Sequence, residues 1–269
     1  MVNLDEKLSN LKTMIKNMDN VAIAFSGGVD STFLSKIAYD TLGERAIAIT
    51  VSSLLTPSYE IEDAKRIAED IGIKHLIVES RLEGKDYLMT NPYDRCYHCK
   101  KDIYNTIKEV AERHNASFIL DGSVVDDSED YRPGFLALKE LEVLTPLRDV
   151  GFTKKEVREL SHRLKLDTWD KPSNPCLASR FPYGTAITHE RLKQVDKAES
   201  FIRSLGVKNV RVRYHYDTAR IEVDKRSFKV VINNNENIIM HLKGLGFRYI
   251  TLDIEGYRRG SLNEGVVSR

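Results

Sequence analysis

The chain has few cysteines, a single tryptophan and almost no net charge. Its 269 residues include three cysteines and one tryptophan, and the formal net charge is +1. Such a charge gives no overall attraction to nucleic acid, so an RNA or DNA partner is not expected without a local basic patch. Three cysteines are too few for a disulfide framework, and a metal-binding or catalytic role is favoured for them.

Long apolar runs are also missing. No run is long enough to cross a bilayer, and the chain does not open with a signal peptide. We therefore expect a cytoplasmic protein without a membrane partner. The hydrophobic content of 41% and the charged content of 30% are typical of a globular protein. The length suits one large domain or two smaller ones.

A glycine-containing loop is the sharpest functional pattern. The apolar run 21–25 is followed by Ser26–Ser31, which reads Ser-Gly-Gly-Val-Asp-Ser, and then by a helical pattern. Strand, turn and helix are expected in that order. The paired glycines allow close approach of a ligand, and Ser26 is expected to cap the helix that begins near Val29.

The start of that helix is suited to a phosphate, because its free N–H groups point at the ligand. Ser31 adds a hydroxyl, and Asp30 is a candidate to hold Mg²⁺ on the phosphates of ATP. The Gly-Lys-Ser/Thr ending of a Walker A loop is absent. The hexapeptide instead resembles the loop of the PP-loop ATP pyrophosphatases, which implies cleavage of ATP between its α- and β-phosphates. We expect Gly27 and Gly28 to contact the nucleotide.

Apolar strands alternate with helical patterns in the first 170 residues. The expected strands are 21–25, 46–51, 74–78, 117–120 and 143–147, and the expected helices include 3–18, 58–71, 97–114 and 153–166. This alternation predicts an α/β fold, a parallel sheet with helices on both faces. Ligands of such sheets bind beyond the carboxyl ends of the strands, where Ser52 and Gly122 join the Ser26 loop as candidate ATP-binding residues.

The alternation of strands and helices ends at a proline-containing stretch. We expect a PP-loop domain at 1–170, a connector at 171–186 that carries Cys176, and a small α+β domain at 187–269. The elements expected in the small domain are a helix at 189–205, a hairpin of 210–214 and 219–223, one or two helices within 225–243, and a strand at 247–253.

The three cysteines allow several interpretations. Cys96 and Cys99 form a Cys-x-x-Cys pair, and Cys176 lies far along the chain. A redox dithiol would leave Cys176 without a role. Zinc usually takes four ligands, and His98 is badly placed to be one. A [4Fe–4S] cluster on three thiolates leaves one iron open for a sulfide or substrate. The cysteines can also be unrelated.

The segment Trp169–Arg180, which reads Trp-Asp-Lys-Pro-Ser-Asn-Pro-Cys-Leu-Ala-Ser-Arg, resembles the LarE family of sulfur transferases. Other segments that resemble the family are Ser26–Ser31, Asp126–Asp127, Tyr131–Gly134, Pro146–Leu147, Thr153–Arg158, Val210–Arg213 and Ala219–Val223. The resemblance extends from about residue 15 to 255. It implies a homo-oligomeric enzyme of nickel-pincer cofactor biosynthesis.

The resemblance also implies the reaction. Family members use ATP to adenylate a carboxylate of a pyridinium-3,5-dicarboxylate mononucleotide, release pyrophosphate, and replace AMP with sulfur. In family members that have a lone cysteine at the position matching Cys176, the protein gives up the sulfur of that cysteine. Three cysteines resemble the iron–sulfur branch, in which Cys96, Cys99 and Cys176 hold a [4Fe–4S] cluster that delivers sulfide. Cys176, Arg180 and Glu199 are then the expected catalytic residues.

Two arginines remain to be assigned. Arg211 and Arg213 alternate on an expected strand, so they project from one face. They are predicted to bind the substrate phosphate, and a solvated strand face is the alternative. Other functions stay open: a tRNA thiolase, an ammonia-using ligase of the same superfamily, or a nucleotide-binding regulator without pyrophosphate release.

Overall fold

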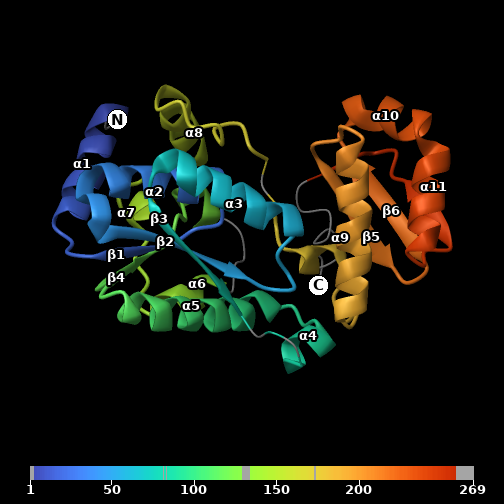
Figure 1. The fold of residues 1–269 in the computed structure, drawn as a ribbon, viewed down its shortest axis with the longest axis horizontal. Helices are drawn as coiled ribbons and strands as arrows, with labels where there is room; N and C mark the ends of the chain where they lie inside the picture. Colours follow the sequence, from blue (N-terminus) through green and yellow to red (C-terminus); the bar gives the residue numbers. More distant parts are fainter. Residues whose placement is uncertain (1–2, 81, 83, 129–133, 173, 259–269) are drawn as a thin grey trace. The chain divides into compact units, whose positions relative to one another are not determined.

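The computed structural model describes residues 3–80, 82, 84–128, 134–172 and 174–258. The chain divides into two compact units (Figure 1). The first comprises 1–53, 58–82 and 93–174, and the second 54–57, 83–92 and 175–269. The change between Asn174 and Pro175 falls inside the stretch expected to be a connector. Residues 131–133 and Ser173, which contribute to the family resemblance, and the tail 259–269 lie outside the described residues.

The first unit contains the parallel sheet expected from the sequence. Its strands are β1 (Val21–Ala24), β2 (Ala46–Ser52), β3 (Lys74–Glu79) and β4 (Phe118–Leu120), in the order β3-β2-β1-β4. All neighbouring strands are parallel, with Val21 of β1 opposite both Ala46 and Phe118. The carboxyl ends of β1, β2 and β4 therefore lie along one edge.

The fifth strand expected at 143–147 is absent as a strand. A single parallel bridge joins Leu144 to Leu120, and the chain then forms the short helix α7 (Pro146–Asp149). Proline has no N–H to donate to a sheet and fits the first turn of a helix, where Pro146 lies. The apolar run is thus divided between a one-residue bridge and a helix.

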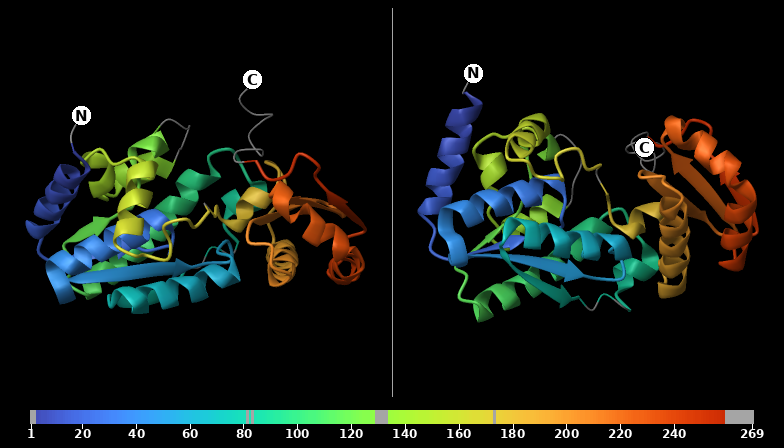
Figure 2. Two further views of the ribbon diagram at one scale, coloured as in Figure 1. Left: turned by 90° about the horizontal axis from the view of Figure 1, so that it is seen from above. Right: turned by 45° about the horizontal axis from the view of Figure 1, so that its top comes forward.

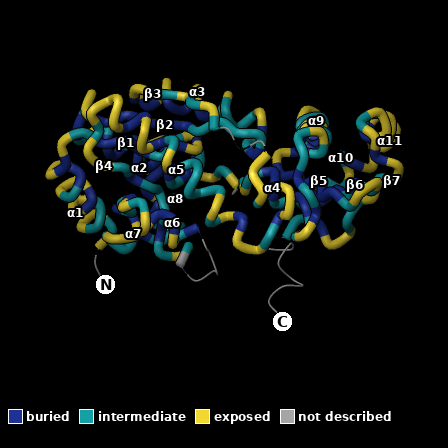
Figure 3. The backbone as a smooth tube through the Cα atoms, turned by 90° about the horizontal axis from the view of Figure 1, so that it is seen from below, coloured by how far each residue is buried: buried dark blue, intermediate teal, exposed yellow. Residues whose placement is uncertain are grey.

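Helices cover both faces of this sheet, as expected. They are α1 (Leu4–Lys16), α2 (Val29–Leu42), α3 (Ser58–Ile71), α5 (Arg95–Arg113), α6 (Gly134–Glu140) and α8 (Lys154–Arg163). Val21 and Ile23 pack with α1, α2, α3 and α8, whereas Ala22 packs with α5 and α6 on the other face. The deeply buried residues follow the strands and the inner sides of the helices (Figure 3).

The second unit contains a three-stranded sheet with the predicted hairpin. Its elements are α4 (Asp86–Thr90), α9 (His189–Ser204), β5 (Val210–His215), β6 (Thr218–Val223), α10 (Phe228–Asn233), α11 (Asn235–Gly244) and β7 (Tyr249–Leu252). β5 and β6 are antiparallel, and β7 runs parallel to β6. Helices α9 and α11, in orange, lie on one side of this sheet (Figure 2). Among the described helices, none has the length and apolarity needed to cross a membrane.

Candidate active site

The loop after β1 has a backbone that only glycine fits. Gly27 has φ +64°, and a Cβ on it would lie 3.2 Å from Cα of Ala64 in α3. Gly28, not Ser26, is the N-cap residue of α2, and no side chain caps the helix. The expectation for Ser26 is therefore wrong in this detail. Its hydroxyl instead accepts from the N–H of Gly28 at 3.3 Å and lies 3.1 Å from the Ser31 hydroxyl.

The absence of a side-chain cap has a chemical consequence. The first N–H groups of an α-helix have no partner within the helix, and the helix dipole adds partial positive charge there. With no capping side chain on α2, these groups are left to water or to an anion. The loop Ser26–Gly28 and the start of α2 thus form a cradle whose geometry suits a phosphate.

The loop that follows β4 packs directly on this cradle. A Cβ on Gly122 would lie 2.9 Å from the backbone nitrogen of Ser31, so only glycine permits the contact. The preceding carboxylate, Asp121, accepts from the N–H of Ser123 at 2.8 Å and from the hydroxyls of Ser123 and Tyr104. These bonds fix the conformation of the loop and tie it to Tyr104 of α5.

Asp121 is charged although it is buried. Burial acts to raise the pKa of its carboxyl group, but the positive charge of Lys100 and the hydrogen bonds from Ser123 and Tyr104 outweigh burial and lower the pKa. Burial and the neighbouring Asp121 raise the pKa of Tyr104 well above its usual value, so its hydroxyl keeps the proton that it donates.

A basic pocket opens beside the cradle. Its lining residues are Ser26, Gly28, Val29, Asp30, Glu60, Lys154, Arg158, Lys171, Pro172 and Asn174. The Nζ of Lys171 donates to the carbonyl of Gly27 at 3.1 Å and to Asp63 at 2.8 Å. The Nζ of Lys154 donates to Asp30. Two lysines therefore reach the glycine loop from α8 and from the segment that follows it.

Arg158 holds the segment that carries Lys171 in place. Its guanidinium donates to the carbonyls of Trp169 and Lys171, each at 2.7 Å. Sequence reasoning missed Lys154, Arg158 and Lys171 as site residues, although all three lie in segments that resemble the family. No spacing rule brings Lys171 to Gly27, which lies 144 positions earlier.

Asp30 has one oxygen that suits a cation. Its Oδ1 is buried and has no hydrogen-bond partner among the described residues. Burial raises the pKa of this carboxyl, and Lys154 only partly offsets the effect. A single carboxylate fits Mg²⁺, which is usually held by one or two carboxylates together with phosphates. Across the described ranges, no group of three or more His, Cys, Asp or Glu residues is placed to hold a metal ion.

The structure brings together most of the predicted nucleotide residues. Ser26, Gly28 and Asp30 line the pocket. Gly27 and Ser31 belong to the same loop and helix, and Gly122 contacts Ser31. Ser52 ends β2, where its carbonyl accepts from Ser80 at 2.8 Å, and it is not among the residues that line the pocket.

Two cysteines lie on the first turns of α5. Cys96 is exposed and Cys99 is half-buried, and their spacing of three places them on one side of the helix. His98 pairs with Asp94 of the same helix at 3.3 Å. Two thiolates on one helical face suit two positions of a cluster. Cys176 belongs to the second unit, where it is half-buried and precedes the short helix η3 (Leu177–Arg180).

A buried ion pair lies behind Cys176. Arg180 and Glu199 each have 0% of their surface exposed, and two parallel hydrogen bonds of 2.8 Å join them. Glu199, an expected catalytic residue, is therefore not exposed on the surface of its helix. Arg180 also donates to the carbonyls of Pro175 at 2.7 Å and Cys176 at 3.2 Å. Glu199 accepts from the backbone of Val212 in β5 at 2.9 Å.

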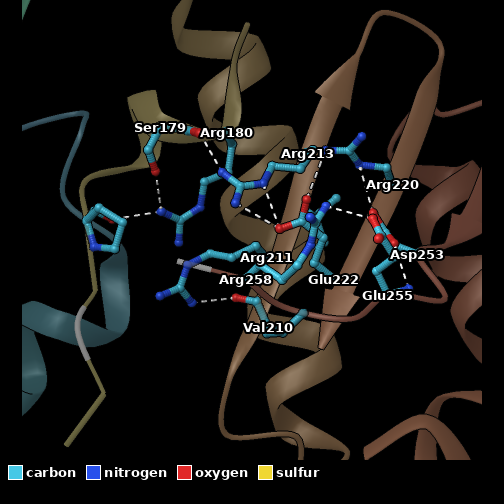
Figure 4. Close-up of polar contacts among 12 residues, drawn as sticks. Ser179, Arg180, Val210, Arg211, Arg213, Arg220, Glu222, Asp253, Glu255 and Arg258 are labelled. Atoms are coloured by element: carbon cyan, nitrogen blue, oxygen red, sulfur yellow. Dashed lines mark hydrogen bonds and ion pairs between the residues drawn. The ribbon is translucent and has the colours of Figure 1, made fainter. Parts of the chain in front are cut away.

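Arg211 and Arg213 lie on one face of β5 and are buried, with 0% and 5% exposure, so the solvated alternative is excluded. Arg213 binds Glu222 at 2.8 Å and donates to the carbonyl of Ser179 at 2.7 Å (Figure 4). Glu222 also accepts from Arg220 at 2.9 Å. The guanidinium of Arg211 lies 5.0 Å from the ring of Tyr257. Arg220 also pairs with Asp253 at 3.7 Å, so the three arginines have two carboxylate partners, and the remaining positive charge suits an anion.

Comparison with known proteins connects these features. The NAD synthase family model matches residues 5–102. An uncharacterised protein of Synechocystis sp. is 43% identical over 97% of this chain and 98% of its own length. The pyridinium-3,5-bisthiocarboxylic acid mononucleotide synthase of Lactiplantibacillus plantarum is 37% identical over 98% of this chain and 96% of its own length. The tRNA-specific 2-thiouridylase MnmA of Rickettsia prowazekii is 26% identical over 65% of this chain and 59% of its own length.

The near-complete coverage by the mononucleotide synthase extends over both units of this chain. Together with the glycine loop, the uncapped α2 and the basic pocket, the similarity shows an ATP-using PP-loop fold followed by the small sheet unit. This chain therefore belongs to the LarE family, that of pyridinium-3,5-bisthiocarboxylic acid mononucleotide synthase, and is an ATP-dependent enzyme.

Proposed function

We propose that the protein is a cytoplasmic sulfur transferase of nickel-pincer cofactor biosynthesis. It adenylates a carboxylate of a pyridinium-3,5-dicarboxylate mononucleotide, releases pyrophosphate and replaces AMP with sulfur. The observation that carries the proposal is the phosphate cradle of Ser26–Gly28 and α2, flanked by Lys154 and Lys171. The 37% identity to a protein named for a thiocarboxylate mononucleotide supports the substrate class.

The cradle suits the adenylation step. A substrate carboxylate oxygen attacks the α-phosphorus of ATP, and the bond to the β-phosphate breaks. Charge then develops on the departing pyrophosphate, where the N–H groups of α2 and two lysines can bind it. Lys154, which donates to Asp30 in this structure, would pair with the phosphates, and Asp30 would then be the residue that holds Mg²⁺, whose positive charge would add to that of the lysines.

The second step exchanges oxygen for sulfur. A sulfide attacks the acyl carbon, and AMP departs with the former carboxylate oxygen. Cys96, Cys99 and Cys176 are the proposed ligands of a [4Fe–4S] cluster, which would supply the sulfide when bound, and an external sulfur donor would restore it. The sacrificial alternative, loss of the Cys176 sulfur, leaves the pair on α5 without a role.

Arg211 and Arg213 are proposed to bind the phosphate of the mononucleotide. Both side chains are buried on the positively charged face of β5. Arg211 would bind the phosphate by charge-assisted hydrogen bonds, whereas Arg213, whose Nε and Nη2 bind Glu222 and whose Nη1 binds Ser179, would contribute its positive charge. We further propose that the second unit serves substrate binding and homo-oligomer formation.

The products test the proposal. Wild-type protein purified without oxygen, given ATP and the dicarboxylate mononucleotide, should form AMP, pyrophosphate and a thiocarboxylate. It should contain about four irons per chain. ADP and phosphate as products would refute the adenylation, and a colourless protein that contains zinc would refute the cluster.

A tRNA thiolase is the second candidate, because this chain is also similar to a tRNA-specific 2-thiouridylase. The net charge of +1 argues against it. Sulfur transfer to tRNA, with none to the mononucleotide, would favour this candidate. The match to NAD synthase would fit an ammonia-using ligase, but ammonia chemistry gives the three cysteines no role.

A further inference from the structure

The turn that carries Cys176 is short and has little secondary structure of its own. η3 has four residues, and Cys176 is its N-cap residue, with no side-chain cap hydrogen bond. Inside the turn, the N–H of Ser179 donates to the carbonyl of Cys176 at 3.0 Å. The N–H of Leu177 donates to the carbonyl of Leu55 at 2.8 Å. The N–H of Phe181 donates to the carbonyl of Ala178 at 3.2 Å, so none of these three bonds among the described residues uses the carbonyls of Pro175 and Ser179.

Two guanidinium groups donate to those carbonyls. Arg180 reaches back to the carbonyls of Pro175 and Cys176, at 2.7 and 3.2 Å, and to the hydroxyl of Ser179 at 2.9 Å. Arg213 donates to the carbonyl of Ser179 at 2.7 Å (Figure 4). Both ends of the turn are therefore held by side chains, while the Cys176 side chain itself remains half-exposed.

Glu199 fixes the first of these guanidinium groups. Its two oxygens bind Nε and Nη2 of Arg180, which leaves Nη1 to point at the turn. The same carboxylate accepts from the backbone of Val212 at 2.9 Å, so it is tied to β5 as well as to α9. A planar guanidinium held at two positions has one orientation, which a lysine ammonium could not adopt.

We infer that Arg180 and Glu199 are positioning residues: they hold the backbone of Cys176 so that its sulfur has one location during sulfur transfer. This inference rests on the proposed function and revises the catalytic role expected for both side chains. All donor positions of Arg180 that would bind an anion bidentately are used by Glu199 and the turn. We call the Arg180–Glu199 pair the clamp. Adenylation takes place at the cradle of α2 and does not need the clamp.

The test compares Arg180→Lys and Glu199→Gln with Arg203→Lys. Arg203 also lies on α9 and donates to a backbone carbonyl, that of Lys208, but it does not contact the cysteine turn. Pyrophosphate formation and sulfur transfer are measured separately, with KM for the mononucleotide. We expect both clamp variants to keep pyrophosphate formation within about twofold and to lose at least about tenfold in kcat for sulfur transfer. Arg203→Lys should match the wild type.

Two readouts do not depend on the reaction. Amide hydrogen exchange over residues 177–181 should rise in both clamp variants and stay at the wild-type level in the Arg203→Lys variant. In a Cys96→Ser/Cys99→Ser background, where Cys176 is the only thiol in the sequence, iodoacetamide should alkylate Cys176 faster after Arg180→Lys. If wild-type protein formed no pyrophosphate, the proposed function would fail, but these two readouts would still test the clamp.

Three results would overturn the inference. A raised KM for the mononucleotide at unchanged kcat would make Arg180 a substrate contact. Unchanged amide hydrogen exchange in both clamp variants, with an unchanged rate of Cys176 alkylation after Arg180→Lys, would show that the turn keeps its position without the clamp. Exchange that rises throughout the second unit, in Glu199→Gln as well as Arg180→Lys, would make the pair a general stabilising element of that unit.

Discussion

At the scale of single residues, charge pairing decides which side chains can bind a ligand. Arg180 is held by Glu199. Within the part of the chain that the structure describes, the Lys171 ammonium makes a hydrogen bond to Gly27 and an ion pair of 2.8 Å with Asp63, which a phosphate can replace. Both residues are positively charged, and both lie in Trp169–Arg180, the segment that resembles the family. Their different partners become visible only in the folded chain.

Lys171→Gln should weaken ATP binding. It removes one charge-assisted hydrogen bond, worth about 1.5–3 kcal/mol, which corresponds to roughly ten- to a hundredfold in affinity. KM for ATP in pyrophosphate formation measures the effect, with Lys65→Gln as a control. Lys65 lies on exposed surface of α3 and pairs with Glu62. An unchanged KM in Lys171→Gln would remove this lysine from the nucleotide site.

Asp121→Asn should destabilise the protein in a pH-dependent way. The folded-state pKa of Asp121 is lowered below 3.8, so its stabilisation is present above that value and is lost as the pH falls through the folded pKa. The free energy of unfolding in urea should differ clearly between wild type and variant at pH 7, and the difference should shrink progressively as the pH is lowered below 3.8. A difference that stays constant as the pH is lowered would contradict the assigned charge state.

At the scale of elements, the glycine loop is where sequence and structure agree best. The strand–turn–helix order, the parallel sheet and the β5–β6 hairpin follow from apolar periodicity alone, because buried strands and amphipathic helices have different periods. Apolar periodicity did not predict that Gly28 is the N-cap residue of α2, or that residues 143–147 do not form a strand. Ser26 lies two positions before the N-cap residue Gly28, and Pro146 divides an apolar run between a bridge and a helix.

Gly122→Ala should separate β4 from α2. The added Cβ would lie 2.9 Å from the backbone nitrogen of Ser31, and overpacking of this kind costs about 1–3 kcal/mol. We expect a lower melting temperature and weaker ATP binding in calorimetric titration. Gly244→Ala is the matched control, since no atom lies within 4 Å of its added Cβ. Equal behaviour of the two variants would show that the close approach is not needed.

At the scale of the whole molecule, two compact units share one chain. Segments 54–57 and 83–92 belong to the second unit although the sequence order places them in the first half. No composition shift marks these short segments, so the sequence predicted only a connector at 171–186, within which the chain passes from one unit to the other. The candidate site was predictable where one loop carries it, as in Ser26–Ser31. It was not predictable where Lys154, Arg158 and Lys171 come from distant segments.

Arg211→Lys should weaken the binding of the mononucleotide but not of ATP. A lysine keeps the charge and loses the planar fork, so roughly a tenfold loss in affinity is expected from one lost charge-assisted hydrogen bond. Calorimetric titration with each ligand measures the difference, and Arg226→Lys, at an exposed position of the same unit, is the control. Equal affinities for the mononucleotide would place Arg211 outside the phosphate site.

The central claim is that the α2 cradle cleaves ATP between its α- and β-phosphates for sulfur transfer. The most direct measurement is product analysis with γ-³²P-ATP and the dicarboxylate mononucleotide, in wild type and in Asp30→Ala. We predict labelled pyrophosphate, with AMP and thiocarboxylate, in the wild type, and none of these products in the variant. Labelled orthophosphate with ADP from the wild type would contradict the claim.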